Sequence, residues 1–260
     1  QLADYRVIAD YIQGIEPLEW LLLALFAGWF LVAYVFVFMA TIPSLRFKEG
    51  FVVQTTATAI NNSLPAGGAI ALPITYSQFL SWGFTPGAVT AGLLTAGVWD
   101  QLARQALPVL AVAAIALLGE AVWWMWLVSI VGVISVGIWI GVLTVILRSE
   151  SAAVGFGRWL TKVVNWFTRK LHRDPVDMVK ATLQFRNNVL HVAENRWKAI
   201  TAATVANHAS MAALFVVSLR AVGVSADDVS TPWVVLAFAL GRLLVMIPVS
   251  PGGLGLVDLG

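Results

Sequence analysis

Long apolar stretches separated by short polar ones dominate the pattern of the chain. Four of them cover residues 18–41, 86–118, 123–147 and 200–222, and a fifth runs from Trp233 to the chain end. A helix of about 20 apolar residues, rising 1.5 Å per residue, crosses the hydrocarbon core of a bilayer. The pattern therefore predicts an all-α polytopic membrane protein built as a helical bundle.

Residues 51–80 are apolar but interrupted at LPAGG, residues 64–68. The pieces before and after this break, about 14 and 12 residues long, are each too short to span a bilayer. We expect them to form a re-entrant hairpin with its tip at the break. A similar break, SPGG at residues 250–253, interrupts the last apolar stretch. If it forms a second hairpin that enters from the opposite face, the two make an inverted repeat.

Basic residues concentrate in residues 148–198, which carry ten Lys and Arg but only four Asp and Glu. By the positive-inside rule this segment is cytoplasmic. Phe156, Leu160 and Val163 recur at helical spacing with basic residues between them, which predicts an amphipathic helix. Such a helix either lies on the inner leaflet or packs into a cytoplasmic helical hairpin. Asp174-Pro175 is expected to start the next helix.

Composition supports a membrane location. Hydrophobic residues make up 59% of the 260 residues and charged residues 12%, against about 25% charged in soluble domains. The absence of cysteine from the sequence excludes disulfides and thiol chemistry. We expect residues 1–260 to form a single transmembrane domain, and to be a piece of a longer chain with at least one further helix.

The two breaks predict a polar site near the middle of the membrane. Half-helix starts carry free N–H groups that favour anions, and glycines let a ligand approach the backbone. Irregular backbone at this depth is tolerated where it lines a cavity or is buried in protein. Tight helix packing through small residues is the alternative. The candidate residues are Asn61, Asn62, Pro65, Gly67, Gly68, Pro251, Gly252, Gly253 and Gly255.

Charged residues inside apolar stretches add to this site. Asp100 and Arg104 lie four positions apart, which predicts an ion pair that is either structural or part of a substrate path. Arg242 has no acidic neighbour in the sequence, so its expected partner is Asp100, Asp258 or a substrate phosphate. His208, next to Asn207, is expected to be hydrogen-bonded within the helix packing rather than to act as a ligand.

Nothing in the sequence indicates an enzyme. It contains no catalytic constellation and no metal-binding cluster, and the GGLG near its end lacks the Lys and Ser or Thr of a phosphate-binding loop. We therefore predict no catalytic residues, no cofactor and no nucleic-acid partner.

Three stretches, NNSLPAGG, WDQLARQ and IPVSPGGLGLVD, resemble the membrane region of the lysylphosphatidylglycerol synthase family. This family includes the flippase half of the multiple peptide resistance factor. The resemblance covers most of residues 18–260, and its terminal motif is the most specific part. The last motif position is usually Glu in the family but is Asp258 here. The matching residues are Asn62, Pro65, Gly67, Asp100, Pro251, Gly252, Gly253, Gly255 and Asp258.

The resemblance implies an integral protein of the bacterial cytoplasmic membrane that moves a phosphate-bearing lipid, such as an aminoacylated phosphatidylglycerol, between leaflets. Its expected partners are membrane lipids with an anionic or phosphate-bearing headgroup, a second copy of the chain in a homo-oligomer, or a separate synthase domain. Three alternatives stay open: a flippase for a polyprenyl-phosphate-linked sugar, a transporter of a small solute, and a non-transporting membrane scaffold.

Overall fold

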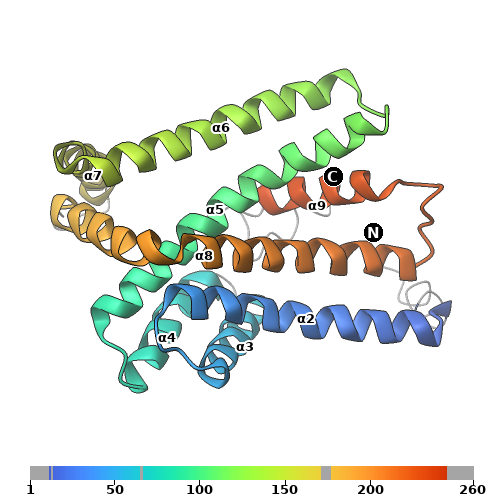
Figure 1. The fold of residues 1–260 in the computed structure, drawn as a ribbon, viewed down its shortest axis with the longest axis horizontal. Helices are drawn as coiled ribbons and strands as arrows, with labels where there is room; N and C mark the ends of the chain where they lie inside the picture. The colour runs from blue at the N-terminus through green and yellow to red at the C-terminus, as the bar shows by residue number, and fades with distance from the viewer. Residues whose placement is uncertain (1–11, 13, 65–66, 171–176, 245–260) are drawn as a thin grey trace.

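The structure, a computed structural model, describes residues 12, 14–64, 67–170 and 177–244. The regular secondary structure of these residues is helical (Figure 1). In chain order the helices are α2 (Pro17–Thr41), α3 (Phe47–Ser63), α4 (Gly67–Ser81), α5 (Pro86–Leu117), α6 (Trp123–Arg148), α7 (Glu150–Lys170), α8 (Val179–Ala221) and α9 (Thr231–Leu244).

Four helices, α2, α5, α6 and α8, are long and apolar enough to cross a membrane. Three of them, α2, α5 and α6, both start and end within a residue of the predicted stretches, so the predicted all-helical architecture with membrane-length helices is confirmed. Helix α5 begins where Pro86 sets the first turn, and the Thr85 side chain accepts a hydrogen bond from the Ala88 N–H at 3.3 Å. Helix α9 is apolar but shorter.

The stretch 51–80 is divided into two helices, as its sequence predicts. Helix α3 ends at Leu64, whose backbone is extended, and α4 begins at Gly67. Gly67 and Gly68, the two glycines of the LPAGG sequence, therefore belong to the first turn of α4. The two helices lie side by side, joined by a hydrogen bond of 3.3 Å from Gln78 Nε2 to Thr56 Oγ1.

Helix α8 corrects two predictions. A boundary was expected near residue 200, between the basic segment and a separate span, but α8 is one helix of 43 residues. Residues 179–221 contain neither proline nor glycine, so nothing in the sequence stops the helix there. Helix α8 also begins at Val179 instead of next to Asp174-Pro175, which lie outside the described residues. Asp177 Oδ1 accepts a hydrogen bond of 2.9 Å from the Val179 N–H.

Helix α7 packs against the start of α8. The Met178 N–H donates to Thr161 Oγ1 at 2.9 Å. The absence of a side chain at Gly157 allows the close approach, because a Cβ there would lie 2.8 Å from Val179 Cα. Trp159 and Trp166, which are more than half exposed, lie on the remaining surface of α7.

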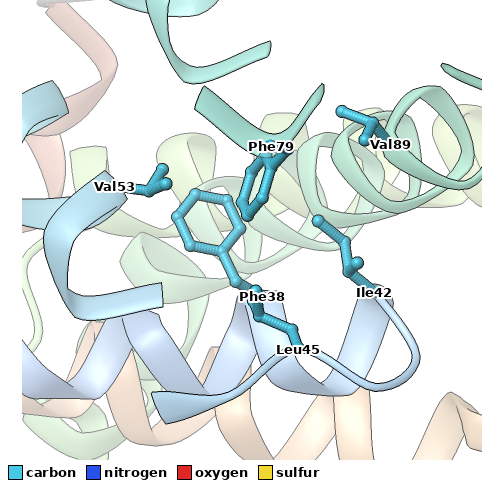
Figure 2. Packing of buried hydrophobic residues seen from close by; sticks show 6 residues of the cluster. All are labelled: Phe38, Ile42, Leu45, Val53, Phe79 and Val89. Carbon is cyan, nitrogen blue, oxygen red and sulfur yellow. The ribbon is translucent and has the colours of Figure 1, made fainter. Parts of the chain in front are cut away.

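A cluster of buried side chains holds the α3–α4 pair against α2 and α5 (Figure 2). Its centre is an edge-to-face contact between Phe38 and Phe79, with ring centroids 5.6 Å apart. The cluster consists of Phe38, Ile42, Leu45, Val53, Phe79 and Val89. It fixes the position of the break between α3 and α4 relative to the long helices.

Helix α9 starts at one end of the molecule, and α3, α4 and α7 lie toward the other end. Figure 1 shows α2 and α8 side by side, with α3, α4 and α7 toward one end. Helix α9 starts at the other end, after the loop that follows α8, and runs back beside α5 and α8. The second break, residues 250–253, lies outside the described residues.

Candidate functional site

A polar cavity of about 340 Å³ lies where six helices meet. Helices α2, α3, α4, α5, α8 and α9 all contribute to its wall. The lining residues are Phe30, Tyr34, Gln54, Ala57, Thr58, Asn61, Asn62, Gly68, Ala71, Asp100, Arg104, Asn207, Met211 and Arg242. A polar cavity among helices of membrane length is unusual enough to mark a candidate functional site.

Much of the sequence-predicted site comes together in this cavity. Asn62, Gly68, Asp100, Arg104 and Arg242 line it, although they come from α3, α4, α5 and α9. Gly67 is buried beside it, at the start of α4. The remaining candidates, Pro65, Pro251, Gly252, Gly253, Gly255 and Asp258, lie outside the described residues.

The predicted pair of Asp100 and Arg104 is an ion pair in the structure. Arg104 Nε and Nη2 both lie 2.7 Å from Asp100 Oδ2. The side chains are 15% and 25% exposed, so the pair is largely withdrawn from the surroundings. Its position on the cavity wall leaves part of the guanidinium available to a ligand.

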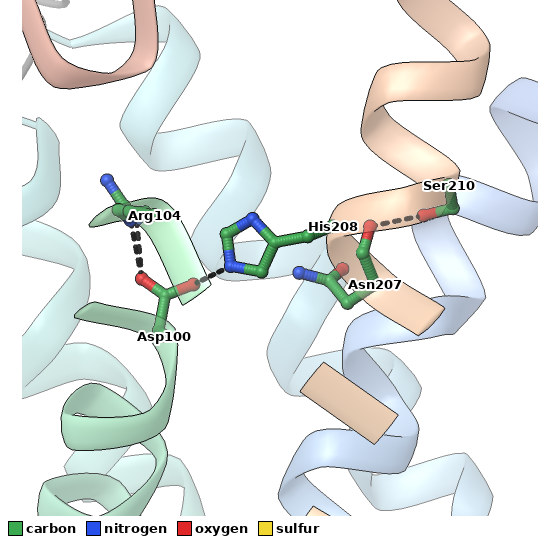
Figure 3. Close-up of polar contacts among 5 residues, drawn as sticks. All are labelled: Asp100, Arg104, Asn207, His208 and Ser210. Carbon is green, nitrogen blue, oxygen red and sulfur yellow. Dashed lines mark hydrogen bonds and ion pairs between the residues drawn. The ribbon is translucent and has the colours of Figure 1, made fainter. Parts of the chain in front are cut away.

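Asp100 also contacts helix α8 through its other oxygen. His208 Nε2 lies 3.0 Å from Asp100 Oδ1, and Figure 3 shows the carboxylate between the guanidinium and the imidazole ring. His208 is 3% exposed. The imidazole therefore makes a hydrogen bond between two helices.

Arg242 brings a second guanidinium into the cavity from α9. Its Nε is buried and has no hydrogen-bond partner among the described residues. The cavity wall thus carries two arginines and one carboxylate. A buried charge is costly without a partner, so this wall favours an anionic group.

Helix α8 carries two further unpaired polar atoms near the cavity. Asn207 Oδ1 and His208 Nδ1 are buried and lack partners in the described part of the chain. Figure 3 shows that the nearby bond from Ser210 Oγ goes to the Asn207 backbone carbonyl, at 2.7 Å, and leaves the Asn207 amide free to point elsewhere. The Asn207 side chain, which lines the cavity, is therefore available to a polar ligand.

The close approach of α4 to α3 requires glycine at the start of α4. A Cβ at Gly67 would lie 2.5 Å from the Ile60 carbonyl oxygen and 2.7 Å from that of Asn61. The next residue, Gly68, lines the cavity, and a Cβ there would meet only Asn61 Oδ1 at 3.3 Å. The two glycines thus have different roles: one permits packing, and the other keeps space in the cavity.

Sequence reasoning missed part of the wall. Gln54 and Thr58 precede Asn61 and Asn62 on α3, and together they form a polar stripe at helical spacing within an apolar segment. That spacing could have identified them. Tyr34 of α2 gives no such signal, because a single tyrosine in an apolar helix looks like any other packed aromatic residue.

No family model matches the chain, and neither a curated protein nor a solved structure matches it. The site is therefore interpreted from its own geometry.

Proposed function

We propose that the protein moves a phosphate-bearing lipid between the leaflets of a bacterial cytoplasmic membrane. The observation that carries this proposal is the polar cavity, which gathers two arginines, one carboxylate and several amides among helices of membrane length. Transfer of a polar headgroup through hydrocarbon costs several kcal/mol when the headgroup has no partners. A polar cavity lowers this cost while the lipid chains remain in the membrane.

The charges on the cavity wall favour a phosphate. Arg104 forms an ion pair with Asp100 at 2.7 Å, whereas the Nε of Arg242 has no hydrogen-bond partner among the described residues. A phosphate group between the two guanidinium groups would accept charge-assisted hydrogen bonds from both. An aminoacylated phosphatidylglycerol and a polyprenyl-phosphate-linked sugar both carry such a group.

Two re-entrant hairpins would give the cavity access to both sides in turn. In this proposal the α3–α4 pair is one hairpin, and α9 with the chain after it is the other, entering from the opposite face. Support comes from α9, which starts at the end of the molecule opposite α7, and from the proline followed closely by two glycines in both breaks. Opposed broken helices related as an inverted repeat are a common basis for alternating access.

Reconstitution of the purified protein in liposomes tests the proposal. Loss of fluorescence after addition of a membrane-impermeant quencher reports the transfer of labelled phosphatidylglycerol to the outer leaflet. We expect Arg104→Gln and Arg242→Gln each to slow this transfer by about tenfold, because a charged hydrogen bond contributes ~1.5–3 kcal/mol. Arg158→Gln is the matched control, since Arg158 is exposed on α7.

Three results would contradict the proposal. Lipid transfer at the wild-type rate by a variant that carries both Arg104→Gln and Arg242→Gln would refute the site. Equal transfer of a labelled glycosyl-diacylglycerol, which has no phosphate, would refute the substrate class. Release of entrapped inorganic phosphate from the same liposomes without lipid transfer would instead support a transporter of a small solute.

A further inference from the structure

A second cavity, of about 810 Å³, lies beside the polar one and differs from it in chemistry. Helices α5, α6, α7 and α8 provide most of its wall. Side chains such as Leu94, Val98, Leu143, Phe156 and Phe185 line it. Gln101 and Thr182 are the main polar groups among the lining residues.

Water does not suit this cavity. An ordered water molecule needs two to four polar partners. The Thr182 hydroxyl already donates to the Met178 carbonyl at 2.8 Å, and the rest of the wall is almost entirely hydrocarbon. An apolar space of this size is stabilised when apolar groups fill it.

The exposed face of α6 indicates which apolar molecule is available to fill the cavity. Ile130, Ile134 and Ile138 are each more than half exposed on this helix, which is apolar along its length. In a membrane that face meets lipid chains. Leu143 and Ile146, which are buried on the same helix, line the cavity instead. Leu94, Trp139 and Val142 line the cavity and are also exposed, so the cavity opens onto the same surroundings.

We propose that this cavity binds an acyl chain of a membrane phospholipid. A chain of ~16 methylenes, at roughly 30 Å³ each, about the volume of one water molecule, needs on the order of 500 Å³ and so fits the space. Phospholipid is the most abundant source of hydrocarbon around a membrane protein, so mass action favours it as the occupant. The site does not depend on translocation, since a membrane scaffold would bind a chain here equally well.

The two cavities lie on either side of the same helices. On α5, Asp100 lines the polar cavity and the next residue, Gln101, lines the apolar one. On α4, Ala71 lines the polar cavity and Leu72 lines the apolar one. Helices α4 and α5 therefore separate a phospholipid chain in the apolar cavity from the polar cavity.

Gly97 offers a variant that fills the cavity without disturbing the fold. It lines the cavity, and a Cβ built on it meets nothing within 4 Å. Gly97→Leu therefore places four carbons in the proposed chain site. Gly141→Leu is the matched control: Gly141 is exposed on α6, its Cβ also meets nothing within 4 Å, and it does not line the cavity. Leu94→Trp fills the cavity from a second position.

The test uses the full chain in liposomes that contain a phospholipid with a photoactivatable diazirine in its acyl chain. After irradiation, mass spectrometry of peptides should find label on the buried residues Leu143 and Ile146. We expect Gly97→Leu and Leu94→Trp each to reduce this label about twofold, because each added side chain occupies part of the space that the acyl chain would fill. Gly141→Leu should leave it unchanged, and thermal unfolding should show that all variants are folded.

Label confined to exposed residues such as Ile134 and Ile138 would overturn the proposal, since it would show only surrounding lipid. Unchanged label on Leu143 in both filled variants would overturn it as well. A different result would refute the proposed function alone. If the phospholipid labels Leu143 and Ile146 but the protein transfers no phosphatidylglycerol, the acyl-chain site is supported and translocation is refuted.

Discussion

Asp100 joins helix α5 to helix α8, because its Oδ1 lies 3.0 Å from Nε2 of His208. Its other oxygen holds Arg104 at 2.7 Å. The carboxylate thus compensates one guanidinium and fixes one imidazole at the same time. Since Asp100 lines the polar cavity, this junction between two long helices also sets the shape of the candidate site.

The junction should be visible as energetic coupling. In a double-mutant cycle of Asp100→Asn and His208→Gln, we expect a coupling free energy of about 1 kcal/mol or more, because the two side chains share a hydrogen bond that is partly withdrawn from solvent. Thermal unfolding of the purified protein in detergent measures it. Arg220→Gln replaces His208→Gln in the control cycle, since Arg220 lies about 18 Å further along α8. Additive effects of Asp100→Asn and His208→Gln would contradict the junction.

Gly67 should tolerate no side chain. Gly67→Ala brings a Cβ to 2.5 Å from the Ile60 carbonyl oxygen, and backbone cannot yield as a flexible side chain can. We expect a destabilisation of about 1–3 kcal/mol, as for other overpacked sites, seen as a lower midpoint of thermal unfolding. Gly97→Ala, where the added methyl group meets nothing within 4 Å, should be neutral or slightly stabilising. Equal effects of the two substitutions would refute the close approach of α3 and α4.

Gly68 should affect transport more than stability. Gly68→Leu directs a side chain toward Asn61 in the polar cavity, and this amide can move aside. On the proposed function, we expect lipid transfer to fall about tenfold while the unfolding midpoint stays near that of the wild type, because the cavity loses volume rather than contacts. Gly87→Leu, at an exposed position with open space around it, is the control. Transfer at the wild-type rate would show that the space beside Gly68 is not used.

The contact between α7 and α8 should depend on Gly157. Gly157→Val places a side chain against Val179 Cα, at 2.8 Å from the added Cβ, and should separate the two helices. Gly155→Val, two residues earlier on the same helix, meets nothing within 4 Å and serves as control. Limited proteolysis between the helices should become faster in the first variant only, since local opening exposes the backbone to the protease.

Arg220 should hold the loop between α8 and α9 in place. Its guanidinium donates to the carbonyls of Val224, Ser225 and Val229 at 2.6 to 2.9 Å. We expect Arg220→Ala to accelerate proteolysis within residues 222–230, and Arg220→Lys to restore protection only in part, because a single ammonium group cannot reproduce the planar fork. Full protection in Arg220→Lys would show that the charge alone is sufficient.

The secondary structure followed closely from the sequence where the local signals were strong. Apolar length predicted α2, α5 and α6, and the Pro-Ala-Gly-Gly sequence predicted the separation of α3 from α4. The prediction failed at α8, where a change from basic to apolar composition was taken as a helix boundary. A change of composition alters the environment of a helix but does not by itself interrupt its backbone hydrogen bonds, and residues 179–221 contain neither proline nor glycine.

The candidate site was predicted less completely. Asp100 and Arg104 are four residues apart, so helical geometry alone brings them together. The contact of Asp100 with His208 links positions 108 residues apart, and no local pattern specifies it. The inclusion of Tyr34 in the cavity wall depends in the same way on how α2 packs beside α8.

The sequence by itself determined the helical class, the membrane-length helices, the separation of α3 from α4 and the intrahelical ion pair, because each depends on neighbours within a few residues. Only the tertiary structure decided that Arg242, Arg104 and Asn62 share one cavity, and that Gln101 of α5 faces an apolar space while Asp100 faces a polar one. These relationships depend on the rotation and crossing of whole helices. The packing of many side chains at once sets that arrangement.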